Sequence, residues 1–311
     1  VQLAKEQAKG LVVHCEDHKA ALMVLYCPVF YHQSIVRTFK DSSVFSCLPL
    51  TRDEAIIFIH GMLKARGLQA YKWGLNTFAD LPDAYVLLKA SKNYSKGRPI
   101  IGFRKAPYKQ LWRAISNVLG DLTNAVYKQA FHSGSMPGMI VSLHRFLKKL
   151  QSSGQGSKFQ FDNTDLIGFF TSVPHDRIVG GVAHVIELFL RNTPSASYDM
   201  TLTTFTQDKG QFVGRTFKGK YRKAGGRTRS ILLKDLLDLV QLGIDSSLFT
   251  FLGKVYLQAL GACIGMQASP ILCGIVASFE EFLWAQSFDM LMTAKHLSGH
   301  YADLFLFRYV D

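Results

Sequence analysis

The chain of 311 residues is long enough for two ordinary domains or for one large domain with subdomains. Hydrophobic residues make up 48% of it and charged residues 19%, a composition that fills a core and excludes a disordered tail. Its net charge of +13 favours a polyanionic partner, either nucleic acid or an acidic membrane surface. The five cysteines are scattered and form no CxxC pair, which indicates a reducing intracellular environment without a disulfide framework or zinc ribbon.

Residues 1–80 are expected to be mainly helical. One apolar helix is predicted near the sequence AALMVLYCPVF and another near RDEAIIFIHGMLKARG. Thr51 precedes the second helix as an N-cap, and Glu54 follows three residues later. This spacing is typical of a capping box, in which each of the two side chains binds the backbone N–H of the other residue. The region shows no pattern that indicates chemistry.

The segment DAYVLLKASKNYSKGRPIIGFRKAP predicts two short strands joined by a basic turn. Pro107 then stands near the start of a predicted helix, where its fixed backbone angle is favourable. Apolar residues recur at helical spacing along this helix, so one of its faces is expected to pack on a core. These residues are Leu111, Ile115, Val118, Leu119, Leu122 and Val126. A further helix is expected near residues 138–150, and a strand at the sequence KFQFD.

A helix from about Asp176 to Arg191 comes next, followed by the basic run KGQFVGRTFKGKYRKAGGRTR. In this run lysines and arginines alternate with aromatic residues, and glycines keep the backbone flexible. The run is either a solvated loop or an arm that follows phosphates and stacks bases on its aromatic rings. An apolar helix at SILLKDLLDLVQLG and a hairpin at SLFTFLGKVYLQALG are predicted after it.

Residues 255–279 contain no charged side chain, and their number suits a membrane span. However, they include two glutamines, a Ser-Pro pair and three glycines, and they run directly into Glu280 and Glu281. We therefore predict a strand, a turn and a buried helix, and no membrane partner. A basic membrane-associated protein built around this segment is the alternative from a different class.

Acidic residues stand at the ends of two predicted strands. The chain ends in HYADLFLFRYVD, an apolar and aromatic run that predicts a strand with Asp311 at its tip. The segment QFDNTDLIGFFTSVP predicts a strand that leads to Asp162 and Asp165. Carboxylates from separate strands suit a two-metal phosphoryl-transfer site, because Mg²⁺ prefers oxygen ligands and the two ions lie about 3.5–4 Å apart. In a basic chain, such a pair predicts a nucleotide polymerase or a nuclease.

Four segments together resemble the motifs of reverse transcriptases, in family order and across about three quarters of the chain. DLIGFFTSVP resembles motif A, and its FT-x-V-P ending is the form seen in Penelope-like elements. GACIGMQASPILCGIVASFEEF resembles motif B, although Met266-Gln267 replaces the first Ser-Pro of the family pattern. FRYVD resembles the start of motif C, and YVLLKASKNYSKGRPIIG resembles the motifs of the fingers.

The resemblance implies that Asp165 and Asp311 are the catalytic acids. They would bind two Mg²⁺ or Mn²⁺ ions, with the backbone carbonyl of Leu166 as a further metal ligand. Asp162 is the competing acid, but the register of FTSVP favours Asp165. Phe170 corresponds to the steric gate below the incoming sugar, where a bulky ring excludes a 2′-hydroxyl and thereby favours deoxynucleotides.

The other residues implied by the resemblance bind substrate. Arg98, with Lys89 or Lys92 near it, is expected to hold the triphosphate, because guanidinium grips phosphate through two parallel hydrogen bonds. The turn beside the template and the nascent base pair is expected to be shaped by Gly265, Ser269 and Pro270.

The resemblance and the order of elements imply an α+β fold. Its palm is an antiparallel sheet backed by helices, as in a right-hand polymerase, and it joins fingers and a helical N-terminal region. The expected boundaries are 1–80 for the helical region, 81–158 for the fingers and 159–311 for the palm. The palm contains motifs A and B, the start of motif C and the basic insertion at about 205–230. The thumb is expected to lie outside this chain.

The expected activity is RNA-directed DNA synthesis, in which a primer 3′-hydroxyl attacks a dNTP. The partners implied are an RNA template, a DNA primer and dNTPs, in an intracellular, nuclear location. Two alternatives of related kind stay open. One is a catalytically inactive nucleic-acid-binding module that keeps the fold, and the other is an RNA-dependent RNA polymerase or a telomerase-type relative.

Overall fold

The computed structural model describes residues 9–16, 19–76, 78–127, 132–133, 136–152, 168–206, 212–219, 228–294 and 307–308. Its α-helices are α2 (Pro28–Phe39), α3 (Arg52–Ala65), α4 (Lys109–Val126), α5 (Met136–Ser152), α6 (Phe169–Ser172), α7 (His175–Asn192), α8 (Leu236–Asp245) and α9 (Ser269–Ala294). Its 3₁₀ helices are η1 (Gln69–Gly74), η2 (Ala90–Lys92), η3 (Phe103–Lys105) and η4 (Leu233–Asp235). Its strands are β1 (Val12–Glu16), β2 (Lys19–Tyr26), β3 (Phe45–Leu48), β4 (Ala84–Leu88), β5 (Gly97–Ile101), β6 (His132–Ser133), β7 (Thr201–Thr206), β8 (Phe212–Gly219), β9 (Thr228–Leu232), β10 (Leu248–Phe251), β11 (Lys254–Gln258) and β12 (Phe307–Arg308).

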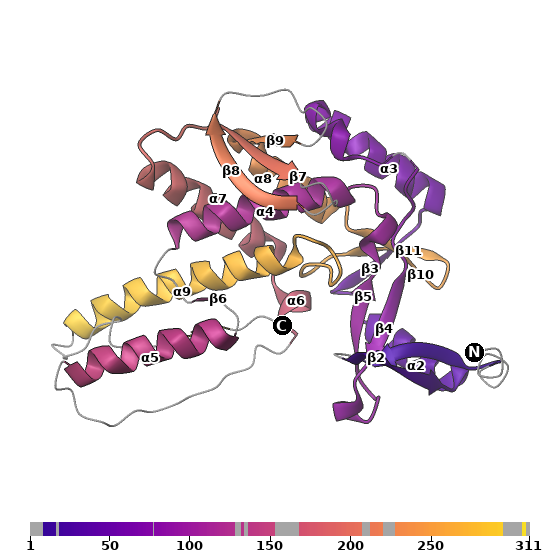
Figure 1. Ribbon diagram of the computed structural model, residues 1–311. Coiled ribbons are helices and arrows are strands. Elements are labelled where there is room, and N and C mark those ends of the chain that lie inside the picture. Colours follow the sequence, from indigo (N-terminus) through magenta and orange to yellow (C-terminus); the bar gives the residue numbers. More distant parts are fainter. Residues whose placement is uncertain are drawn as a thin grey trace.

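Helices and strands alternate along the chain, so the predicted mixed α+β class is confirmed (Figure 1). The strands form small sheets in which the orders are β1-β2, β4-β5, β10-β11-β3 and β8-β7-β9, all antiparallel. β12 differs because it runs parallel to β6, a pairing that the sequence did not predict. The predicted strand KFQFD lies outside the described residues, as does most of the strand that ends at Asp311.

The helix α3 begins as its sequence predicts. The Thr51 side chain accepts a hydrogen bond from the backbone N–H of Glu54, and the Glu54 carboxylate accepts one from the backbone N–H of Thr51 at 2.8 Å. The bond from the Thr51 N–H, together with one that the Thr51 hydroxyl donates to the same carboxylate, lowers the pKa of the Glu54 carboxyl below its usual value. The capping box therefore satisfies N–H groups that the first turn of a helix leaves without a partner.

The N-terminal region is less helical than predicted. The apolar residues up to Tyr26 belong to strand β2, and α2 begins only at Pro28. Val24 and Tyr26 pack on the core, whereas Met23 and Leu25 are exposed, which is the alternation of a strand with one buried face. The prediction of a helix here was wrong, because the hydrophobic pattern of a short apolar run fits a strand and a helix equally well.

The region after α7 also differs from the prediction. The helix expected over SILLKDLLDLVQLG begins at Leu236, because its first residues belong to β9 and η4. Part of the basic run, which was expected to be flexible, forms β8 and pairs with β7. Pairing between strands gives the backbone N–H and C=O groups the partners that a loop would have to find elsewhere.

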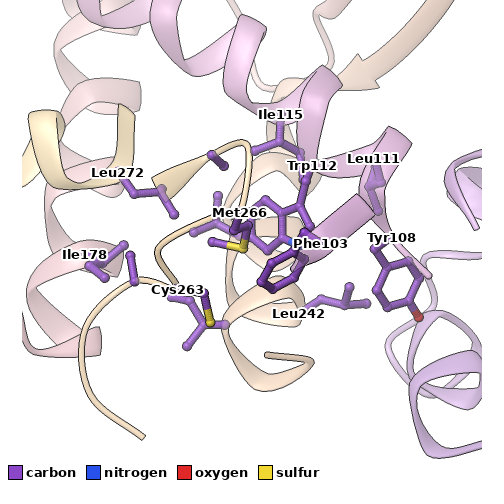
Figure 2. Packing of buried hydrophobic residues seen from close by; sticks show 14 of the residues in the cluster. Phe103, Tyr108, Leu111, Trp112, Ile115, Ile178, Leu242, Cys263, Met266 and Leu272 are labelled. Atoms are coloured by element: carbon purple, nitrogen blue, oxygen red, sulfur yellow. The ribbon is translucent and has the colours of Figure 1, made fainter. Parts of the chain in front are cut away.

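The core lies where α4, α7, α8 and α9 meet. Leu111, Ile115, Val118, Leu119 and Leu122 of α4 are buried as their helical spacing predicts, and Val126 is partly buried. Figure 2 shows side chains from each of the four helices in this packing, among them Trp112, Ile178, Leu242 and Leu272.

Residues 255–279 divide into strand β11, a loop and the first part of α9, as predicted. By length and composition alone, Ser269–Phe288 of α9 is apolar enough to cross a membrane, with a mean hydropathy of 1.2. Core helices share this composition, and Leu272, Cys273 and Ile275 are fully buried against the rest of the chain. The first turns of α9 therefore belong to the core.

The cysteines differ in burial, which leads to a test of the core. Burial raises the pKa of Cys263 and of Cys273 to about 12, while Cys27 and Cys47 are exposed and Cys15 is partly exposed. Because the thiolate is the reactive form, the native protein at about pH 8 should react with Ellman's reagent at the latter three thiols only. Unfolding in guanidinium should make the thiols of Cys263 and Cys273 reactive as well. Rapid reaction of all five thiols in the native protein would contradict the burial.

Candidate functional site

The β4–β5 hairpin carries the predicted triphosphate-binding cations. Arg98 pairs across the hairpin with Leu87, Lys89 directly precedes the η2 turn, and Lys92 is the last residue of that turn. Residues 84–101 contain four cationic and no acidic residues, so the hairpin attracts anions. It extends away from the helical core, with α2 and the β1–β2 hairpin beside it (Figure 1).

Buried contacts hold this hairpin on the side of α2. The Tyr31 hydroxyl donates a hydrogen bond to the Val86 carbonyl at 3.1 Å, and burial raises the pKa of Tyr31 above its usual value. His14 of β1 lies on Tyr85 with 5.0 Å between the ring centres. Since Val86 is fully buried, the hairpin has a fixed position relative to the N-terminal region.

Residues 261–268, in the loop between β11 and α9, contain most of the turn that resembles motif B. One end of this 261–268 loop is joined to the turn around α6. The backbone N–H of Gly261 donates to the Val173 carbonyl at 2.8 Å, and that of Ala262 donates to the Phe170 carbonyl at 2.7 Å. His175 Nε2 lies 2.9 Å from the Gly261 carbonyl, so this nitrogen carries the proton, because a carbonyl only accepts.

The 261–268 loop also contacts the base of the β4–β5 hairpin. The backbone N–H of Ile101 donates to the carbonyl of Ile264 at 2.8 Å. Gly265 has a φ of +114°, and a Cβ at this position would lie 2.2 Å from the Ile101 carbonyl oxygen. Glycine is required here for both reasons, since L side chains rarely adopt this backbone conformation and the space is already filled.

The end of the loop is fixed by Ser269, which is 1% exposed. Its hydroxyl donates to the Cys263 carbonyl at 2.6 Å, and its backbone N–H donates to the Met266 carbonyl at 3.2 Å. Pro270 follows as the second residue of α9, where its missing N–H removes no hydrogen bond of the helix. Ser269 therefore closes the loop on itself.

Met266 and Gln267 stand where the resembling family has Ser-Pro. Met266 is 3% exposed, and Figure 2 shows its side chain against Trp112 and Phe103. The thioether anchors the loop in the core by apolar contact. The side-chain oxygen of Gln267 is buried, and no hydrogen-bond partner for it lies among the described residues.

The structure brings together the predicted residues Phe170, Gly265 and Ser269, all through the 261–268 loop. Arg98 precedes Ile101 by three residues in β5, which corresponds to about 10 Å along the strand. Lys89 and Lys92 lie at the opposite end of the hairpin, farther from the loop. Of the three cations, Arg98 is therefore nearest to the other predicted residues along the hairpin.

The predicted metal ligands Asp165, Leu166 and Asp311 lie outside the described residues, as does the competing acid Asp162. Within the described part of the chain, no group of three or more His, Cys, Asp or Glu side chains is placed to hold a metal ion. The expectation that two acids meet at neighbouring strand ends therefore stays a prediction.

Sequence reasoning missed two residues that connect this site. Gly261 has a φ of +80°, and a Cβ there would lie 2.3 Å from the Phe170 carbonyl oxygen. His175 is the first residue of α7, directly after Pro174. The first glycine of the sequence GACIG was a signal for Gly261, whereas nothing local in the sequence identifies the carbonyl that His175 contacts.

Replacing Gly265 with alanine should lower the free energy of unfolding by about 2–3 kcal/mol, because it adds backbone strain and a clash with the Ile101 carbonyl. Gly274→Ala in α9 is the matched control. A Cβ at Gly274 meets no atom within 4 Å, so alanine should stabilise the helix by up to about 1 kcal/mol. Urea unfolding followed by circular dichroism measures both changes. Equal stability of the two variants would contradict the close approach at Gly265.

No protein-family model and no curated protein sequence matches the chain. Several solved structures, in contrast, are similar to the chain. An apo telomerase from Candida tropicalis, truncated from its C-terminal domain, has a TM-score of 0.58 and 11% identity over 93% of this chain and 52% of its own. A telomerase from Candida albicans, in complex with the TWJ fragment of telomeric RNA, has a TM-score of 0.58 and 10% identity over 92% and 44%. The corresponding Candida tropicalis complex has a TM-score of 0.59 and 11% identity over 93% and 42%.

These likenesses show that the chain shares its fold with the matched part of these solved structures. The particular structures that it resembles are telomerases, and nearly all of this chain takes part in the match. The chain spans between 42% and 52% of the length of these telomerase chains. An identity of 10–11% shows a shared fold and leaves the activity to be inferred from the site.

Proposed function

We propose that the chain forms the fingers and palm of an RNA-directed DNA polymerase, a retroelement reverse transcriptase of the Penelope-like type. One observation carries the proposal. The 261–268 loop is joined by backbone hydrogen bonds both to the turn at Phe170 and to the hairpin that bears Arg98. These are the three segments whose sequences resemble motif B, motif A and the fingers motifs, and a polymerase site needs them in one place.

Each group of residues has its own role in nucleotidyl transfer. The cationic β4–β5 hairpin attracts the triphosphate of a dNTP, and the guanidinium of Arg98 holds it. The carboxylates of Asp165 and Asp311, with the Leu166 carbonyl, would supply the oxygen donors that Mg²⁺ or Mn²⁺ prefers. Two such ions, when bound, stabilise the charge on the attacking and leaving oxygens. The 261–268 loop positions the base pair that forms between the dNTP and the template.

Primer extension tests the proposal. The protein, extended past Asp311 because the resemblance places a second acid directly after this residue, is mixed with an RNA template, a DNA primer, dNTPs and Mg²⁺. We expect template-dependent extension that chelation by EDTA stops. If the protein binds the primer–template in a salt-sensitive manner but does not extend it, the chain is an inactive nucleic-acid-binding module and the polymerase proposal is wrong.

The steric gate gives a sharper prediction. Phe170 is half-buried, its ring centre lies 6.4 Å from that of Phe169, and its carbonyl is fixed by Ala262. Phe170→Ala should leave dNTP incorporation within about threefold and raise rNTP incorporation by about tenfold or more, since the removed ring excludes the 2′-hydroxyl. Single-nucleotide incorporation with dNTP and rNTP measures both rates, and Phe169→Ala is the matched control. Unchanged rejection of rNTPs by Phe170→Ala would remove the gate assignment.

A further inference from the structure

One aromatic side chain outside the site is almost fully exposed. Phe78 is 97% exposed, more than any other large apolar side chain in the described part of the chain. A buried phenylalanine contributes about 2–3 kcal/mol to folding, and Phe78 forgoes nearly all of it. A surface turn that serves only to reverse the chain normally carries Asn, Asp, Ser or Gly. The ring therefore contributes little to folding and is free to contact a partner.

Backbone hydrogen bonds on either side of Phe78 attach this part of the chain to residues 105–107. The backbone N–H of Asn76 donates to the Pro107 carbonyl at 2.9 Å, and that of Asp80 donates to the Lys105 carbonyl at 3.2 Å. Between them, the Ala79 N–H donates to the Asn76 carbonyl at 3.2 Å. Leu81, which follows Asp80, is 2% exposed and anchors the segment in the core. Phe78 is thus exposed on a segment that is hydrogen-bonded to the neighbouring chain on both sides.

Cations lie next to this turn. The backbone N–H of Asp80 donates to the Lys105 carbonyl, which brings the Arg104–Lys105 backbone next to the turn that carries Phe78, and both side chains are exposed. Asp80 itself forms an ion pair with Arg52. Within the described residues, no carboxylate forms an ion pair with Arg104 or Lys105. Lys105 also acts on the Asp80 carboxylate, whose pKa its charge helps to lower. The surface around the turn therefore carries two exposed cations and one carboxylate that is paired with Arg52.

We propose that Phe78, Arg104 and Lys105 form a binding surface for single-stranded nucleic acid, in addition to the polymerase site. A base stacks on the face of Phe78, and the adjoining phosphates contact the two cations. An aromatic ring can stack on the base of a nucleotide, and neighbouring cations can bind its phosphate. An apolar protein partner would gain nothing from the charges. The net charge of +13 favours the same partner. The proposal does not depend on polymerase activity, because it concerns binding alone.

Fluorescence anisotropy with a labelled oligo(dT) of about 12 nucleotides tests the stacking on the 311-residue chain. Phe78→Ala should weaken binding by about fivefold to a hundredfold, and Phe78→Trp should retain or increase it, since stacking on one ring is worth about 1–3 kcal/mol. Phe78→Leu keeps an apolar side chain without a ring and should bind like Phe78→Ala. Ile57→Ala, which removes another exposed apolar side chain, should bind like the unchanged protein.

Two further measurements fix the place of contact. The double variant Arg104→Gln/Lys105→Gln should reduce the slope of log K against log salt by about 0.7 for each phosphate contact removed. Irradiation with an oligonucleotide that contains 5-bromodeoxyuridine should attach the base to the peptide that includes Phe78. Binding by Phe78→Leu equal to that of the unchanged protein would assign the surface to an apolar partner and overturn the proposal. Cross-links found only at other peptides would also overturn it.

Discussion

The Asp165→Asn substitution should lower primer extension at least about a thousandfold without changing the stability of the protein. Asparagine keeps the size of the side chain but loses the negative charge that a divalent ion needs. The several kcal/mol of charge stabilisation that a bound ion supplies to the transition state correspond to a loss of this size. The rate of single-nucleotide incorporation with Mg²⁺ measures the effect, and circular dichroism during thermal unfolding measures the stability.

Asp162→Asn provides the matched control, because the two acids stand three residues apart in the same segment. The register of FTSVP assigns the metal to Asp165, so the Asp162 variant should keep its incorporation rate within about threefold. The opposite result, an inactive Asp162 variant beside an active Asp165 variant, would show that the register of the resemblance is shifted by three residues. Normal activity of both variants would remove this segment from the site.

The parts of the fold that were predicted correctly share a strong local signal. The capping box of α3 depends on two residues, Thr51 and Glu54, whose spacing is enough to identify it. The apolar positions of α4 repeat over about four turns, and the helix forms with that face buried. The β4–β5 hairpin has two extended runs on either side of a polar turn. In each case the interactions that decide the structure lie within a few residues of one another.

The parts that were predicted wrongly depend on distant contacts. The run up to Tyr26 is a strand because β1 pairs with it and because its buried face packs on Tyr31 and Tyr94. The first residues of the helix expected before Leu236 are a strand because β7 pairs with them. Neither partner is visible from the local sequence, since the same apolar residues suit a helix equally well.

The candidate site shows the same division. The motifs identified Phe170, Gly265 and Ser269 from the sequence, and the structure joins their segments. The sequence did not show how they are joined, because most of the connecting hydrogen bonds run between backbone groups that every residue carries. The side chains of Ser269 and His175 are the exceptions, and the partner of His175 lies 86 residues away in the chain.

The Gly243→Ala substitution should destabilise the protein by about 3 kcal/mol or more, the largest effect that we expect from adding one methyl group. Gly243 lies in α8 against α4, and a Cβ there would lie 1.4 Å from Cζ2 and 1.9 Å from Cη2 of Trp112. Trp112 is 2% exposed, so its ring has no free space, and the two helices must separate to admit the methyl group. Urea unfolding measures the loss.

Gly180→Ala in α7 is the control for this substitution, because Gly180 is an exposed helical glycine and a Cβ there meets no atom within 4 Å. It should stabilise the protein by about 0.5–1 kcal/mol. Trp112→Phe replaces the indole whose atoms clash, so the double variant Trp112→Phe/Gly243→Ala should lose less stability than the sum of the two single variants. Additive losses would mean that the clash at Trp112 is not the cause, and that the packing of α8 against α4 differs from the one described.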